Sequence, residues 1–154
     1  MTPNETAILT ALRALQDETE IRNLIATYGP LVDHGDPEAV AGLWTTDGRY
    51  EVDHGAYENA AAIADMVRSD PHMTLIRNGC SHVLGPLHVR VDGDTATATG
   101  YSMLIVAEQE QHIVRRVSAN KWELIRTADG WRARRRVNRR MAGAEYAHQL
   151  LVEG

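Results

Sequence analysis

The sequence predicts an α+β fold in which N-terminal helices pack into a strongly curved antiparallel sheet, forming a cone with an internal pocket. Apolar residues in the first third of the chain recur at helical spacings, and after residue 79 the period changes to the alternation typical of strands. Turn sequences divide the second half into four consecutive segments of strand length. Helices followed by such a meander indicate an α+β order, and a curved sheet closed by helices encloses a pocket.

The apolar pattern of the N-terminal region predicts helices. Residues 8–15 begin one apolar stripe, and residues 21–32 continue it at spacings of three and four. Asp17, with Glu20 three positions later, fits a capping box between these two stretches, so we expect a helix boundary there. The Gly29-Pro30 pair is expected to weaken the second stretch, because proline has no amide donor and crowds the preceding turn.

Two shorter helices and one strand are expected before the meander. Asp36 followed by Pro37 is typical of an N-cap and a first helical residue, and the helix that follows is expected to bury Val40, Leu43 and Trp44. Asn59 is expected to cap a third helix over residues 60–68. Between these helices, residues 48–52 are predicted to form a short strand.

The second half of the chain predicts four strands. They cover residues 81–91, 95–106, 112–127 and 131–141, and the turns between them contain residues 92–94, 109–111 and 128–130. Gly85-Pro86 indicates a bulge or an edge position in the first of these strands. A short C-terminal helix is expected after Gly143.

Composition and charge limit the classes of function. The chain of 154 residues has the size of one domain, with 44% apolar and 24% charged residues. A net charge of −5 argues against nucleic acid as the main partner. The single cysteine, Cys80, excludes an internal disulfide and is typical of a reducing cytoplasm, where we expect the protein. We expect no signal peptide and no membrane partner, because no basic start precedes an apolar core and no apolar run approaches about 20 residues.

The sequence resembles the SnoaL-like family. Residues 21–52, 80–103 and 128–137 carry the resemblance, and they include the motifs LWTTDG, VDGDTATA and DGW in this order. The family lies within the cone-shaped superfamily that also includes scytalone dehydratase, ketosteroid isomerase and nuclear transport factor. The resemblance implies a single cone domain over residues 1–154, and it specifies the fold better than the function because this fold carries many chemistries.

Some members of this superfamily are lyases that hold an aspartate and a histidine in the cone, among them bile-acid dehydratase, scytalone dehydratase and hexachlorocyclohexane dehydrochlorinase. Matched residue by residue, this pair falls on Asp33 and His82, and the tyrosine that precedes the aspartate in the dehydratases falls on Tyr28. The sequence departs from the dehydratases on the second long strand, where the only candidates for their additional polar group are Tyr101 and Ser102.

The implied pair can act as an acid–base group. A neutral imidazole takes up a proton near pH 7, and a carboxylate bonded to its other nitrogen fixes the tautomer and stabilises the imidazolium. The alternative is structural: Asp33 caps a turn, and His82 is a hydrogen-bonded strand residue. The Tyr28 hydroxyl either polarises a substrate oxygen or is the polar tip of a half-buried aromatic side chain.

Several aromatic and basic side chains are candidates for substrate binding. Trp44 and Trp122 are expected in the core or in the pocket wall. The arginine-rich run over residues 132–140 is either a solvated or oligomer-contacting sheet face, or it places Arg135 or Arg139 at the pocket to bind an anionic group. Tyr50 loosely matches a pocket tyrosine of scytalone dehydratase. The residues that we expect to bind substrate are Trp44, Tyr50, Tyr101, Trp122 and Arg139.

We expect neither a metal nor a cofactor. The sequence has no HxH, HExxH or CxxC motif. His82 and His88 lie six positions apart on one predicted strand, which separates them by roughly 20 Å, too far to share one ion. His34 and His54 are predicted as loop residues on the solvent side. Cys80 has no base beside it in the sequence and is expected to be inert.

The residues and the resemblance together predict a small cofactor-independent lyase or isomerase for a hydrophobic, cyclic, oxygenated compound such as a steroid, terpenoid or polyketide. Loss of water is the favoured reaction, with His82 as base, Asp33 as its partner and Tyr28 on the oxygen side. A polyketide cyclase uses the same first step and is the nearest alternative. The other alternative is a non-catalytic ligand-binding or assembly domain, such as the small subunit of a ring-hydroxylating dioxygenase. By analogy with the family, we expect a homo-oligomer, either a dimer or a trimer.

Overall fold

A six-stranded sheet with the strand order β2-β1-β6-β5-β4-β3 forms the centre of the fold. The computed structural model describes residues 1–143 and 145–152. Its helices are α1 (Pro3–His34), α2 (Pro37–Ala41), α3 (Ala60–Arg68), α4 (Asp70–Arg77) and α5 (Glu145–Val152). Its strands are β1 (Trp44–Val52), β2 (Gly55–Tyr57), β3 (Cys80–Asp92), β4 (Thr95–Glu108), β5 (Gln111–Thr127) and β6 (Gly130–Arg140).

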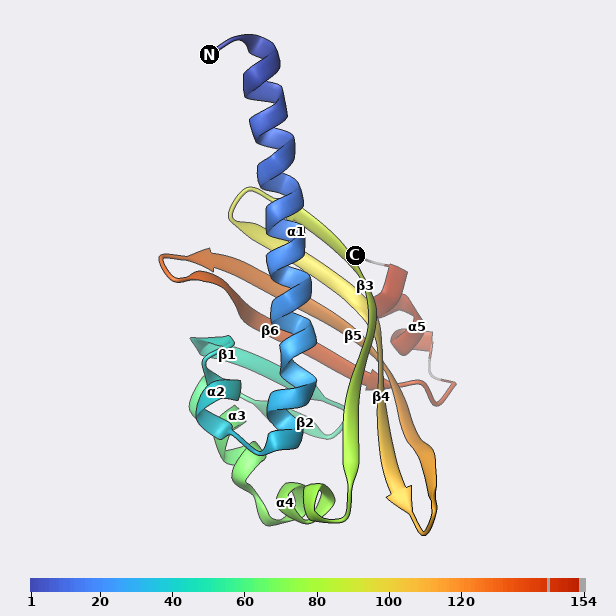
Figure 1. Cartoon of the computed structure of the whole chain (residues 1–154). Helices are drawn as coiled ribbons and strands as arrows, with labels where there is room; N and C mark the ends of the chain where they lie inside the picture. Colours follow the sequence, from blue (N-terminus) through green and yellow to red (C-terminus); the bar gives the residue numbers. More distant parts are fainter. Residues whose placement is uncertain (144, 153–154) are drawn as a thin grey trace.

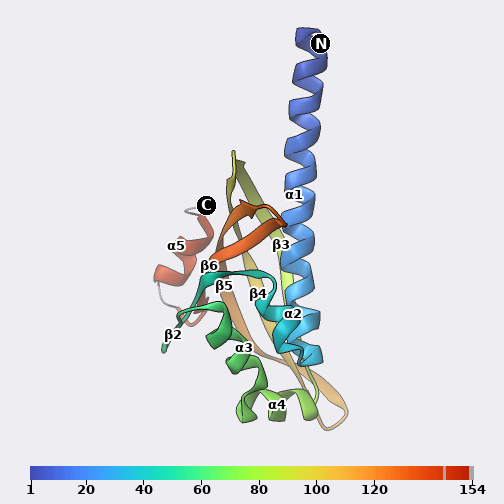
Figure 2. The same cartoon turned by 90° about the vertical axis from the view of Figure 1, so that its left-hand side faces the viewer.

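The four long strands form the predicted antiparallel meander, and β1 extends it in parallel beside β6. The sheet is strongly curved and does not close into a barrel (Figure 1). Helix α1 lies on its concave side, α2 to α4 cover one end, and α5 packs on the convex side (Figure 2). The predicted α+β cone is therefore confirmed. Among the helices described, none combines the length and the apolar character that crossing a lipid bilayer requires.

Helix α1 is one continuous helix of 32 residues, so the predicted boundary at Asp17 is wrong. The helix begins at Pro3, and its N-cap is Thr2, whose hydroxyl accepts the backbone N–H of Glu5 in a capping box. The Asp17 carboxylate instead accepts from Arg126 at 2.7 Å and from the indole N–H of Trp131 at 3.3 Å. These contacts attach the middle of the helix to the β5–β6 hairpin, and they override the local capping signal.

The N-terminal half of α1 projects beyond the sheet (Figure 1). Its apolar side chains Ile8, Leu12 and Leu15 are 52%, 54% and 62% exposed, so the stripe that predicts the helix there does not enter the core. The buried residues of α1 lie between Ile21 and Val32. Only this C-terminal half of the helix contributes to the site.

Helix α1 lies very close to β3 at Gly29. A side chain on Gly29 would overlap the backbone carbonyl oxygen of His82, so glycine is required for this approach. Pro30 remains inside the helix, which continues to His34 and ends at Gly35 in the left-handed region, with φ of 73°. Burial against the sheet stabilises this segment despite the missing amide donor of the proline.

Substituting Gly29 by alanine is expected to lower the free energy of unfolding by about 1–3 kcal/mol, the typical cost of overpacking. The added methyl group would push α1 away from β3 beside the carbonyl of His82. Urea denaturation measures the change. Gly42→Ala is the control, because a methyl group there would lie 3.4 Å from its nearest neighbour, an ordinary contact distance. Equal losses in the two variants would contradict the close-packing explanation.

The start signals of α2 and α3 act as predicted. Asp36 accepts the Ala39 amide at 2.9 Å, and Asn59 accepts the Ala62 amide at 2.8 Å. Helix α2 is shorter than expected: it ends at Ala41, so Leu43 and Trp44 do not belong to it, and Trp44 begins β1. Helix α4 is an additional element that the apolar pattern does not predict. The signal for it is Pro71 in its first turn, the same feature that marks the start of α2.

Two of the irregularities in strand pairing affect which side chains of β3 and β6 face the concave side of the sheet. One lies between residues 84 and 87 of β3, where a bulge or edge is predicted. The other lies in β6, where Arg134 is left without a partner between Ala133 and Arg135. The extra residue reverses the alternation along β6. Arg136 therefore faces the concave side together with Ala133, whereas regular alternation would place it on the same side as Arg134.

Candidate functional site

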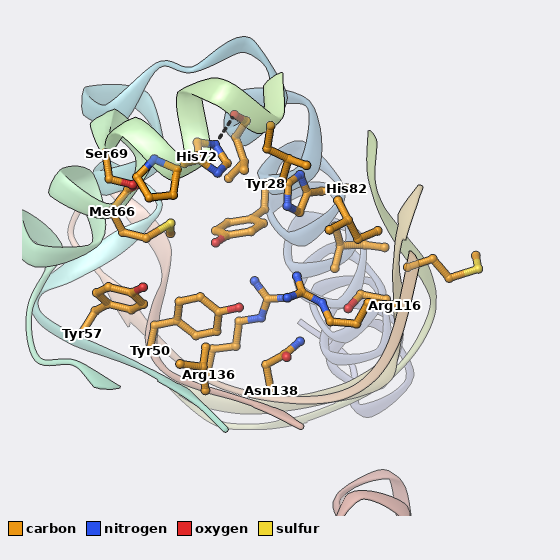
Figure 3. Close-up of a pocket in the computed structure, with 18 of the residues that line it drawn as sticks. Tyr28, Tyr50, Tyr57, Met66, Ser69, His72, His82, Arg116, Arg136 and Asn138 are labelled. Atoms are coloured by element: carbon orange, nitrogen blue, oxygen red, sulfur yellow. Dashed lines mark hydrogen bonds between the residues drawn. The ribbon is translucent and has the colours of Figure 1, made fainter. Parts of the chain in front are cut away.

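A cavity of about 270 Å³ lies between the C-terminal half of α1, the helices α3 and α4, and the concave side of the sheet (Figure 3). Its wall combines apolar side chains with tyrosines, histidines and arginines, and no aspartate or glutamate is among the described residues that line it. The volume lies just below the range of about 300–1,000 Å³ that is typical for drug-sized ligands. The cavity therefore suits a small compound.

Asp33 and His82 meet at one side of this cavity, although they lie 49 positions apart in the sequence. Asp33 comes from the last turn of α1 and His82 from the start of β3. One carboxylate oxygen lies 2.6 Å from Nδ1 of His82, and the other accepts the backbone N–H of His82 at 2.8 Å. Because an ionised carboxylate only accepts hydrogen bonds, we assign the ring proton to Nδ1. In the neutral form of the ring, Nε2 is then the nitrogen with the lone pair, and the ring lines the cavity (Figure 3).

The hydrogen bonds from His82 also affect the protonation of Asp33. Burial raises the pKa of the Asp33 carboxyl, but the bonds from the His82 ring and backbone outweigh burial and hold the pKa below its usual value. Asp33 is therefore ionised at neutral pH. A carboxylate in this position stabilises a positive charge on the imidazole.

The lowered pKa of Asp33 predicts a contribution to stability that depends on pH. A carboxyl whose pKa is lower in the folded state stabilises the fold above its unfolded pKa, and this stabilisation is lost as the pH falls through the folded pKa. We expect the wild-type protein to lose more unfolding free energy than Asp33→Asn as the pH falls from about 5 to about 2. Urea denaturation at several pH values measures this. Parallel pH curves for the two proteins would contradict the prediction.

Cys80 lies beside the same carboxylate, with Sγ 3.7 Å from Asp33 Oδ1. Burial and the adjacent negative charge raise the pKa of its thiol to about 11, so the thiol remains protonated and unreactive. Asp33, Cys80 and His82 place potential ligand atoms within 4.8 Å of one another, and they are the described group that comes closest to a metal site. An ion there would replace the Asp33–His82 hydrogen bond and require the thiolate, so these residues fit a metal poorly.

His72 is a site residue that sequence reasoning missed. It lies in α4, is buried, and has Nε2 3.1 Å from the carbonyl oxygen of Val32. Burial lowers the pKa of His72, so the ring is neutral at pH 7 and Nε2 donates to this carbonyl. Its ring centre lies 5.7 Å from that of His82, so His72 packs beside the proposed base.

Arg136 is the second residue that sequence reasoning missed. It is only 3% exposed although it carries a charge, and it lines the cavity from β6. Its guanidinium carbon lies 4.4–4.7 Å from the centres of three aromatic rings, those of Trp122, Tyr28 and Tyr50. The bulge in β6 explains the omission, because a strict alternation places Arg136 in phase with the exposed Arg134.

Asn120 holds the guanidinium group of Arg136 in place. Its side-chain oxygen accepts Nε and Nη2 of Arg136 at 3.0 and 2.7 Å, and it also accepts the Asn138 amide at 2.8 Å. The side-chain nitrogen of Asn120 lies 2.9 Å from Oγ of Ser102. The sequence signal for this network is a pair of asparagines, Asn120 and Asn138, inside two predicted strands.

The aromatic residues predicted for catalysis or for substrate binding divide into two groups. Tyr28 and Tyr50 line the cavity, and both are almost fully buried. Trp44 and Trp122 lie outside the lining, at 4% and 0% exposure, and their ring centres are 5.7 Å apart in the core. Tyr101 is 50% exposed and also lies outside the lining. The expectation that these last three residues contact substrate is therefore corrected.

The predicted role of Arg139 or Arg135 at the pocket is also wrong. Both pair with Glu51, Arg135 at 2.8 Å and Arg139 at 3.6 Å, and neither lines the cavity. The bulge at Arg134 turns these two residues to the other side of the strand. Arg136 occupies the position that was expected for them.

Two other histidines differ in part from their predicted environment. His54 is exposed, as predicted, but it also lines the cavity. His34 is exposed as well, although it is the last residue of α1 rather than a loop residue. The ring of neither residue is hydrogen-bonded to Asp33 or His82 in the described part of the chain.

Comparisons with known proteins agree with this fold. A family model for the SnoaL-like domain matches residues 13–137. A crystal structure of an NTF2-like protein with a cystatin-like fold from Novosphingobium aromaticivorans is 45% identical, covers 95% of this chain and 96% of its own, and has a TM-score of 0.92. A Mycobacterium tuberculosis protein of unknown function is 26% identical over 91% of this chain and 76% of its own, with a TM-score of 0.71.

A more distant structure shares the fold alone. ActVI-ORFA from Streptomyces coelicolor is 20% identical over 80% of this chain and 97% of its own, with a TM-score of 0.70. No curated protein matches the sequence. The fold is therefore shared well beyond the range in which sequence identity indicates a common function.

Proposed function

The chain belongs to the SnoaL-like family, and from this membership and the Asp33–His82 pair in its cavity we propose that it is a cofactor-independent lyase or isomerase. Its substrate is a small, cyclic, oxygenated compound. The single observation that carries the proposal is the 2.6 Å hydrogen bond between Asp33 and His82, because it leaves the other imidazole nitrogen as a base at the cavity.

In the proposed reaction, Nε2 of His82 takes a proton from a carbon beside a carbonyl group. The electron pair of the broken C–H bond forms the new double bond as a neighbouring C–O bond breaks. The imidazolium then returns its proton to the leaving hydroxyl group, which departs as water. Asp33 stabilises the transient imidazolium through Nδ1, and no redox change or added reactant is required.

Tyr28 is proposed to donate a hydrogen bond to the substrate oxygen. Burial raises the pKa of its hydroxyl group, so the group stays protonated and acts as a donor. Tyr28→Phe is expected to lower kcat by about 10²–10³-fold, as the loss of one such donor typically does. A steady-state assay measures the change. Unchanged turnover would mean that Tyr28 has only a packing role. Its ring contacts those of Trp44 and Trp122.

Two measurements on a panel of cyclic β-hydroxyketones test the proposal. Elimination forms a conjugated enone, which absorbs in the near ultraviolet. Exchange of the carbon-bound proton in D₂O, followed by NMR, reports the first step even where no product forms. We expect enzyme-dependent exchange for at least one compound that binds. Compounds that bind in calorimetry but show no exchange would contradict the proposal and favour a non-catalytic ligand-binding or assembly domain.

The same measurements separate the lyase from a polyketide cyclase. A cyclase also begins with removal of a proton from an activated carbon, but it forms a carbon–carbon bond and no water leaves. Exchange without enone formation, followed by a ring-closed product of unchanged mass, would identify the cyclase.

A further inference from the structure

We propose that the cavity binds the carboxylate group of an acidic substrate between the guanidinium groups of Arg136 and Arg116. The inference rests on the proposed function and deepens it by naming the substrate class. That class is a small cyclic compound that carries a carboxylate in addition to its reacting oxygen.

Arg136 has a buried positive charge that no described carboxylate neutralises. Its acceptor is the amide oxygen of Asn120, which is neutral. The salt bridges of the same strand involve Arg135, Arg139 and Arg140 instead. A buried charge without an opposite charge is costly. An anion that enters the cavity can therefore pair with the Arg136 guanidinium without displacing a carboxylate of the described residues.

One nitrogen of this guanidinium group is left to bind such an anion. Nη1 of Arg136 is buried and has no hydrogen-bond partner in residues 1–143 and 145–152. Asn120 and the surrounding aromatic rings hold the group in one orientation. A donor that is positioned in advance loses little conformational entropy on binding. The planar edge of a guanidinium group also matches the geometry of a carboxylate.

Arg116 supplies a second cation from the neighbouring strand. It lies on β5 opposite Leu104, and its guanidinium group points into the cavity toward that of Arg136 (Figure 3). With the described residues it forms no salt bridge or side-chain hydrogen bond. Two like charges that face each other repel, and an anion between them replaces this repulsion by two attractions.

The cavity lining has the opposite sign to the chain as a whole. The net charge of the protein is −5, yet the charged groups among the described lining residues are arginines, with histidines beside them. Asp33 is hydrogen-bonded to His82 and is not part of this lining. The rings of Tyr28 and Tyr50 supply flat surfaces for the cyclic part of the same compound.

Isothermal titration calorimetry with matched probes tests the inference. The probes are benzoate, 2-naphthoate and 1-naphthaleneacetate, each compared with its carboxamide, which has the same shape and no charge. We expect at least one carboxylate to bind the wild-type protein ten times or more tightly than its carboxamide. The inference is overturned if no carboxylate shows this preference, or if inorganic phosphate competes as strongly as the best carboxylate.

Three variants connect the preference to the two arginines. Arg136→Gln and Arg116→Gln are each expected to reduce the preference for the carboxylate over its carboxamide to less than threefold. Asn120→Asp places a carboxylate against Arg136 without changing the size of the side chain, so it is expected to remove the preference while the protein stays folded. Arg134→Gln is the control, because this exposed residue of β6 carries the same charge away from the cavity. A preference that survives Arg116→Gln and Asn120→Asp in folded protein would overturn the inference.

The failure of this inference is distinguishable from the failure of the proposed function. His82→Asn is expected to stop proton exchange while the preference for carboxylates remains. If the protein exchanges the carbon-bound proton of neutral compounds but binds carboxylates no more tightly than carboxamides, the lyase proposal stands and the carboxylate inference fails. A preference without exchange would leave a carboxylate-binding protein that is not an enzyme.

Discussion

Replacing His82 by asparagine is expected to lower the rate of proton exchange by about 10²–10⁴-fold, the usual contribution of a general base. The asparagine amide can still donate to Asp33, as Nδ1 does at 2.6 Å, but it has no equivalent of Nε2. The substitution therefore removes the base and retains the local hydrogen bond. NMR of the exchange reaction in D₂O measures the rate.

The control for this variant is His88→Asn, an exposed histidine on the same strand. It is expected to exchange protons at the wild-type rate. Circular dichroism and calorimetry show whether the His82 variant is folded and still binds ligand. A folded His82→Asn protein with wild-type exchange would exclude His82 as the base, and the proposed mechanism with it.

Replacing Asn120 by alanine is expected to destabilise the protein by about 3 kcal/mol. The substitution leaves Nε and Nη2 of Arg136 and the amide of Asn138 without their shared acceptor, in a site from which water is excluded. A buried charge that loses its hydrogen-bond partner is among the most costly defects in a folded protein. Urea denaturation at pH 7 measures the change.

Asn120→Asp is the matched variant for this measurement. It retains an acceptor for both side chains and adds a negative charge beside Arg136, so its stability is expected to stay within about 1 kcal/mol of the wild-type value. If the alanine variant were as stable as the aspartate variant, the hydrogen bonds to Asn120 would contribute nothing, and Arg136 would be held by its aromatic neighbours alone.

The sequence predicts those elements whose boundaries depend on local chemistry. The caps at Asp36 and Asn59 use side-chain oxygens that bond amides three residues away, so neighbouring residues contain the whole signal. The turns of the meander are local in the same way. Asp17 shows the limit of this reasoning, because its carboxylate is taken by Arg126 and Trp131, more than 100 positions away.

The candidate site was predictable only in part, because its residues meet through tertiary structure. Asp33 and His82 are matched by the resemblance to a family, and no local pattern joins them. The pocket position was expected for Arg135 or Arg139 rather than Arg136, because one unpaired residue, Arg134, reverses the alternation of β6. A bulge of this kind depends on pairing with β5, so the sequence of β6 alone does not reveal it.

The projecting half of α1 has a practical consequence for handling the protein. Residues 3–16 rise about 1.5 Å each along the helix, which carries the N-terminus roughly 20 Å beyond the sheet and away from the end that α2 to α4 cover (Figure 1). A surface tether or fluorescent label attached at Met1 would therefore lie far from the residues that line the cavity. The free apolar face formed by Ile8, Leu12 and Leu15 would then lie nearest the support, where coating with a detergent or a hydrophilic polymer keeps it from adsorbing.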